Sequence, residues 1–140
     1  MPSSLYFLAP AIALLFTKIG KMWSSYNLTH TWDWNRLVTS GGMPSDHSAV
    51  VCSLATIVGL INGVSDPSFA IAAVMAGIVM YDSVNVRLST GTQGDALKAL
   101  IAETKSGIRL DRIAYGHKIS EMVIGSLIGV LAGLAVFYLL

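Results

Sequence analysis

The sequence contains little charge. Only 12% of its 140 residues are charged, and 54% are hydrophobic, whereas soluble domains carry about a quarter charged residues. A chain with so few charges is expected to expose much of its surface to lipid. The formal net charge of +1 provides no basic excess, so nucleic acid is not an expected partner. The length predicts a single membrane-embedded domain over residues 1–140.

Cysteine and clustered metal ligands are also scarce. The single cysteine, Cys52, lies in an apolar run, where packing is its expected role, and it cannot form an internal disulfide. The chain has no cysteine cluster and no closely spaced histidine pair of the kind that binds zinc. A metal held by His47 and His117 with Glu121 and Asp82 is the alternative, but this spacing disfavours it. We therefore expect neither a metal nor another cofactor.

Long hydrophobic runs, by contrast, are abundant. A spanning helix needs about 20 predominantly apolar residues, and the apolar segments that approach this length are 5–19, 47–64, 67–86 and 122–140. The first is short, and it lacks the basic start and cleavage site of a signal peptide, which predicts a retained membrane helix. The fold class expected is therefore all-α, an integral membrane helical bundle with about four apolar spans plus short amphipathic helices. One such helix is predicted over residues 95–103, above the site.

The distribution of Lys and Arg predicts a topology. These residues flank the two long connections, whereas the short turn at 63–67 has none. The positive-inside rule then places both long connections on the cytoplasmic-equivalent face and both termini on the other. The alternative is that these cations bind an anionic substrate. Because successive spans alternate in direction, His47, Arg87 and His117 are expected at one face of the membrane.

The turn Gly41-Gly42-Met43-Pro44-Ser45-Asp46-His47-Ser48 precedes the second apolar segment. Helix N-termini expose unpaired N–H groups and bind phosphate. Gly41 and Gly42 allow close approach of the backbone to an anion, Ser45 can donate a hydroxyl hydrogen bond, and His47 falls in the first helical turn. This pattern predicts a phosphate cradle. Helix capping alone also accounts for the proline and the serine.

A second histidine begins the fourth apolar segment. His117 and Glu121 are four residues apart, so on a helix the carboxylate can accept a hydrogen bond from the imidazole. This contact would fix the tautomer and make the other ring nitrogen a nucleophile or a base. The alternative is an exposed histidine–glutamate pair of little consequence.

Several cations are candidates for binding phosphate. Arg87 can grip a phosphate through its planar guanidinium, or it can extend to the membrane interface. Asp82 is expected to pair with Arg87 or with another cation, because an isolated charge near a span is costly. Arg36 and Lys18 could reach the same phosphate, and each could equally be a solvated interfacial charge.

Glycine recurs at every fourth position in the last apolar segment. Gly125, Gly129 and Gly133 form a ridge of small residues that permits close helix contact. The ridge could serve packing within one chain or a homodimer.

The motifs together resemble those of the phosphatidic acid phosphatase type 2 superfamily, which also contains vanadium-dependent haloperoxidases. The resemblance is closest to its divergent bacterial and plastid branch. It covers most of the chain from about Lys18 onward and is carried by residues 36–48, 79–87 and 116–121. It implies a bacterial inner membrane or a plastid membrane as the location.

The resemblance also implies roles for individual residues. His117 would attack phosphorus and form a phosphohistidine, and His47 would protonate the leaving oxygen. Glu121 would take the place of the aspartate that usually orients the nucleophile. Ser45 and nearby backbone amides would hold phosphate oxygens, helped by lysine and arginine, and no metal is implied.

The chain departs from the superfamily pattern in several ways. Asp46 stands where a glycine is usual, and a carboxylate there would repel phosphate unless it is paired or points away. Arg36 is not followed by proline, no Ser-Arg pair precedes His117 at the usual distance, and integral members commonly have six spans. Arg87 could replace the missing arginine from another element.

Three functions are compatible with these features. The first is a membrane phosphatase acting on a lipid phosphate or an isoprenoid diphosphate, since the Gly41–Ser48 turn is also similar to that of polyprenyl diphosphate phosphatases. The second is a catalytically inactive membrane protein that binds phospholipid headgroups or assists assembly, which the departures favour. The third is a small channel or transporter subunit, which the gathering of polar residues at one face disfavours.

Overall fold

A computed structural model describes residues 3–32, 34, 42–110, 113 and 115–140. The described part of the chain is helical and contains no strand, which confirms the all-α prediction. The elements, in order, are α1 (Leu5–Thr29), α2 (Asp46–Asn62), α3 (Pro67–Tyr81), the π-helix η2 (Asp82–Val86), α4 (Arg87–Thr104) and α5 (Ile119–Leu139).

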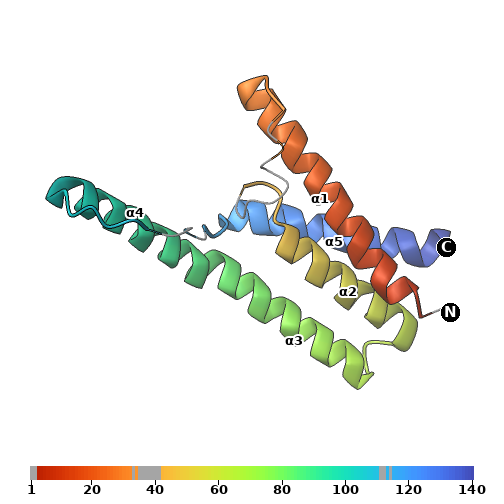
Figure 1. The fold of residues 1–140 in the computed structure, drawn as a ribbon. Helices are drawn as coiled ribbons and strands as arrows, with labels where there is room; N and C mark the ends of the chain where they lie inside the picture. The colour runs from red at the N-terminus through yellow and green to blue at the C-terminus, as the bar shows by residue number, and fades with distance from the viewer. Residues whose placement is uncertain (1–2, 33, 35–41, 111–112, 114) are drawn as a thin grey trace.

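Figure 1 shows how the helices are arranged. Both termini lie at the same end of the bundle as the turn between α2 and α3, and the starts of α2 and α5 lie at the other end. Helix α2 is central, because it packs against α1, α3 and α5. The arrangement therefore gathers the first residues of α2, the end of α3 and the start of α5 at one end of the molecule.

The connection between α2 and α3 is short for local reasons. Gly63 ends α2 with a φ of +90°, which favours glycine. The Asp66 carboxylate accepts a hydrogen bond from the Ser68 N–H and caps α3, with Pro67 in the first helical position. The tight turn predicted here is confirmed, and it makes α2 and α3 antiparallel neighbours.

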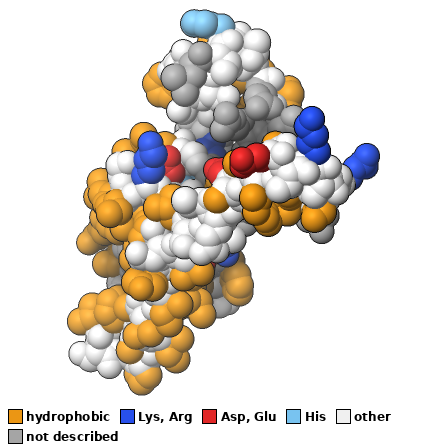
Figure 2. Space-filling view, turned by 90° about the vertical axis from the view of Figure 1, so that its left-hand side faces the viewer, with side chains coloured by type: hydrophobic (Ala, Val, Ile, Leu, Met, Phe, Trp, Pro, Cys, Tyr) orange, Lys and Arg blue, Asp and Glu red, His pale blue; other side chains and the backbone are white. Residues whose placement is uncertain are grey.

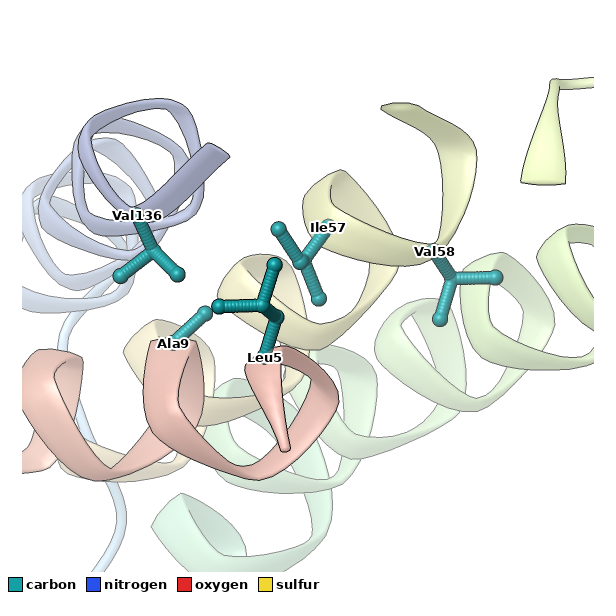
Figure 3. Packing of buried hydrophobic residues seen from close by; sticks show 5 residues of the cluster. All are labelled: Leu5, Ala9, Ile57, Val58 and Val136. Carbon is teal, nitrogen blue, oxygen red and sulfur yellow. The ribbon is translucent and has the colours of Figure 1, made fainter. Parts of the chain in front are cut away.

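The hydrophobic core lies towards the end of the bundle that holds the termini. It consists of buried side chains from α1, α2 and α5, shown in Figure 3: Leu5, Ala9, Ile57, Val58 and Val136. The buried positions of α1 recur every fourth residue and change from apolar to polar along the helix: Leu5, Ala9, Ala13, Thr17, Lys21 and Ser25. One face of α1 therefore leads from the core to the polar end.

The glycine ridge of α5 packs against α2 within the chain. A Cβ added at Gly129 would lie 2.3 Å from the Ala49 carbonyl oxygen, and one added at Gly125 would lie 2.4 Å from the Ser45 carbonyl oxygen. No side chain fits at such distances. The ridge is thus occupied inside one protomer, and the homodimer that the sequence allowed through it would need another surface.

Within the part of the chain that the structure describes, three helical segments are long and apolar enough to cross a membrane: Leu5–Asn27, Pro67–Thr104 and Ile119–Leu139. Helix α2 has 17 residues, or about 26 Å at 1.5 Å per residue, slightly less than the hydrocarbon core of about 30 Å. Hydrophobic side chains cover much of the lower part of Figure 2, whereas charged side chains gather above. This separation is that of an integral membrane protein with one polar end.

Helix α1 is longer than the sequence predicted. The predicted segment ended at Ile19, but the helix continues to Thr29. It continues because Lys18 and Lys21, which read as the start of a connection, pair with the Asp46 carboxylate of α2. Both charges therefore lie against a carboxylate at the polar end of the bundle instead of ending the helix.

The amphipathic helix predicted at 95–103 is part of a longer element. Helix α4 continues from α3 through η2 and projects away from the bundle, so it does not cover the site (Figure 1). The chain that returns from α4 packs back along it, with Ile113 against Gly94 and Tyr115 against Gly91. This return path supports the helix where it leaves the bundle.

Candidate functional site

His117 is held at the polar end of the bundle by its own carboxylate partner. Its side chain is 2% exposed, and Nδ1 lies 3.0 Å from the Glu121 Oε2. The same oxygen accepts a hydrogen bond from the backbone N–H of Lys118. A proton on Nδ1 therefore faces the carboxylate, and the lone pair of Nε2 is left for chemistry.

The backbone before α5 explains why His117 occupies this place. α5 begins at Ile119, so His117 precedes the helix, whereas the sequence predicted it on one. Its N–H donates to the Ser83 carbonyl in η2 at 2.9 Å. A Cβ at Gly116 would lie 2.3 Å from the Leu88 nitrogen, so only glycine permits this close approach. Helical π-turns are frequent at functional sites, and here the π-turn anchors the histidine.

His47 faces His117 from the start of α2. The two ring centroids are 6.2 Å apart, with an angle of 63° between the ring planes. His47 itself is exposed, and it interacts electrostatically with Arg87, Lys21 and His117. One histidine is thus buried and oriented, and the other lies at the open side of the same site.

The turn before α2 provides both a cap and a candidate cradle. Ser45 is the N-cap, and its side chain accepts from the Ser48 N–H; its own N–H donates to the Glu121 carbonyl. Gly42 has a φ of +81°, which favours glycine. Within the described residues, the N–H groups of Asp46 and His47 have no acceptor, so the helix N-terminus retains donors for an anion.

Asp46 pairs with two lysines of α1. Its Oδ2 lies 2.9 Å from Lys18 Nζ and 2.8 Å from Lys21 Nζ, and the Lys21 side chain is 4% exposed. The carboxylate that would repel phosphate is therefore paired. The fourfold spacing of the buried positions on α1 includes Lys21, a signal by which the sequence could have identified this buried lysine.

Arg87 pairs with Asp82 across η2, as the sequence predicted. The distance between Arg87 Nε and Asp82 Oδ2 is 2.6 Å, and both side chains are partly exposed. The terminal Nη groups make no hydrogen bond to any other described residue, so they remain able to bind an oxyanion. Of the other predicted phosphate ligands, Lys18 contacts Asp46, and Arg36 and Gly41 lie outside the described residues.

Among the residues that the structure describes, no three His, Cys, Asp or Glu side chains gather closely enough to hold a metal ion. What the site brings together is a buried histidine paired with a carboxylate, a second histidine, a helix N-terminus and three cations. This combination can bind an anion and transfer a group to or from an imidazole.

The fold and the site define an all-α integral membrane protein with paired histidines at its polar end. The chain belongs to the Divergent PAP2 family, whose model matches residues 3–132. It is 30% identical over 147 residues to the Uncharacterized membrane protein YuiD of Bacillus subtilis (strain 168), an alignment that covers 94% of this chain and 92% of YuiD. No solved structure matches the chain. The family resemblance inferred from the motifs is thus confirmed.

Proposed function

We propose that the protein is a membrane phosphatase that hydrolyses a lipid phosphate or an isoprenoid diphosphate through a phosphohistidine intermediate. The observation that carries the proposal is the facing pair of His117 and His47, with Glu121 on the Nδ1 of His117. Membership of the Divergent PAP2 family supports the reaction class. The site lies at the end that carries the paired lysines and arginine, which favours the cytoplasmic-equivalent face.

In the first step, the lone pair of His117 Nε2 attacks phosphorus and the bond from phosphorus to the leaving oxygen breaks. His47 donates a proton to that oxygen, so the lipid leaves as an alcohol or as a lipid monophosphate. Glu121 stabilises the positive charge that develops on the His117 ring. The N–H groups at the start of α2 and the Arg87 guanidinium would bind the phosphoryl oxygens.

In the second step, water attacks the phosphohistidine and the phosphorus–nitrogen bond breaks. His47, now neutral, accepts a proton from the water, which restores the starting protonation states and releases inorganic phosphate. The same two histidines therefore complete the cycle without a resident cofactor.

A purified sample in detergent micelles tests the proposal. We expect phosphate release from lipid phosphates, inhibition by vanadate, which mimics five-coordinate phosphorus, and unchanged activity in EDTA. Binding of phospholipid headgroups without release of phosphate would instead identify a catalytically inactive binding protein. Loss of activity in EDTA that Mg²⁺ restores would contradict the proposed chemistry.

Replacement of Glu121 by glutamine tests the pairing with His117. Glutamine keeps an oxygen acceptor for Nδ1 but removes the charge that stabilises the imidazolium, so kcat is expected to fall about 10²-fold with little change in KM. Glu103→Gln, at the exposed end of α4, is the control and should retain wild-type activity. An unchanged kcat in Glu121→Gln would show that the pairing is structural only.

A further inference from the structure

The cations around the two histidines each lie against a carboxylate. Lys18 and Lys21 share Asp46, and Arg87 pairs with Asp82. The lysine cluster retains a net charge of about +1, whereas the arginine pair has none when all groups are ionised. A site with this balance offers an anion less positive charge than its number of cations implies.

Asp46 is the carboxylate that reduces this positive charge beside His47. It immediately precedes His47, and its Oδ2 accepts from Lys21 at 2.8 Å. Within the described residues, its other oxygen, Oδ1, is buried and has no hydrogen-bond partner. A carboxylate oxygen without a donor remains a source of negative potential, and in a region of low dielectric that potential acts strongly on a nearby anion.

Charge balance bears on the choice of substrate. A phosphate monoester carries a charge of about −1.5 to −2 at neutral pH, and a diphosphate monoester carries roughly one negative charge more. An additional carboxylate in the site therefore disfavours the diphosphate more than the monophosphate.

We propose that Asp46 is a specificity-determining residue that limits the positive charge of the site and makes a lipid monophosphate, rather than a diphosphate, the preferred substrate. This inference rests on the proposed phosphatase function and narrows its substrate class. Asp46 acts by its charge on the bound phosphate and through the lysines that it holds.

The test compares kcat/KM for a monophosphate and a diphosphate that carry the same prenyl chain, at low ionic strength. The wild-type protein is expected to prefer the monophosphate. Asp46→Asn is expected to shift the ratio towards the diphosphate by about tenfold. Lys21→Met is expected to shift it in the opposite direction, because it removes a positive charge.

Two further variants keep the outcome interpretable. Asp66→Asn removes a carboxylate at the opposite end of the bundle, where asparagine still caps α3, and should leave the ratio unchanged. Asp46→Asn combined with Lys21→Met restores the net charge, so its ratio should return to that of the wild type. If Asp46→Asn alone does not fold, the double variant is compared with Lys21→Met, and its ratio should lie about tenfold further towards the diphosphate. Equal ratios in these two variants would overturn the inference.

Three further results would overturn the inference: a wild-type preference for the diphosphate, an unchanged ratio in Asp46→Asn, or a double variant that differs from the wild type as much as Asp46→Asn does. If the wild type hydrolyses neither lipid, the phosphatase proposal fails by itself. Calorimetry then measures the affinities for inorganic phosphate and pyrophosphate, and their ratio tests whether the charge of Asp46 affects the preference. Asp46→Asn should still shift this ratio towards pyrophosphate by about tenfold.

Discussion

Replacing His117 by asparagine is expected to reduce phosphate release by at least about 10³-fold, because it removes the attacking nitrogen of the proposed reaction. Asparagine retains a polar side chain in a position that is 2% exposed, so the fold should survive. Phosphate release from a lipid phosphate in micelles measures the loss. A brief reaction with a substrate labelled on its phosphate is quenched in alkali, which preserves phosphohistidine. The wild-type protein should then carry the labelled phosphate, and the variant should carry none.

The matched control is His30→Asn. His30 ends α1 with a φ of +52°, a left-handed conformation that asparagine tolerates well, and its side chain is exposed. This variant should retain full activity and full labelling. Equal phosphate release by the wild type and His117→Asn would exclude His117 as the nucleophile.

Local patterns in the sequence predicted the parts of the structure that depend on near neighbours. The turn between Asn62 and Pro67 follows from glycine and an Asp-Pro pair, and it is present. The contact between His117 and Glu121 follows from their spacing, although here the spacing crosses the start of α5 and does not lie within the helix. The pairing of Asp82 with Arg87 was likewise predictable.

Contacts between segments that are far apart in the sequence could not be predicted from local patterns. The sequence predicted that the Asp46 carboxylate would repel phosphate unless it is paired or points away. It could not show that Lys18 and Lys21 contact that carboxylate, because 25 or more residues separate them from Asp46. For the same reason the end of α1 was placed at Ile19 and not at Thr29. Charges that look solvated along the chain become partners once the helices pack.

The continuation of α3 into α4 was missed for a related reason. The sequence predicted a helix only over residues 95–103, whereas α4 spans Arg87–Thr104 and includes Gly91 and Gly94, although glycine weakens a helix. In the structure each glycine makes room for a side chain of the returning segment, Tyr115 or Ile113. Their role is packing against a segment some 20 residues later, which no local pattern reveals. The same contacts guide the chain back to Gly116 and His117.

Substitution of Gly129 should affect both the fold and the site. A Cβ there would lie 2.3 Å from the Ala49 carbonyl oxygen and 2.9 Å from the Ala49 Cα. Gly129→Ala gains about 1 kcal/mol of helix propensity, but it must separate two backbones, and overpacking of this kind typically costs about 1–3 kcal/mol or more. We expect a lower Tm for Gly129→Ala in detergent, and no folded protein for Gly129→Leu.

The matched control is Gly77→Ala in α3, where an added Cβ meets nothing within 4 Å, and its Tm should stay the same or rise slightly. The consequence for activity follows from geometry. Ala49 lies in the first turns of α2 and is fully buried, so displacing α5 there also separates the helix start that carries His47 from the segment that carries His117. Gly129→Ala should therefore lose activity at temperatures where it is still folded. A Gly129→Ala variant as stable and as active as Gly77→Ala would show that close contact between α2 and α5 does not position the two histidines.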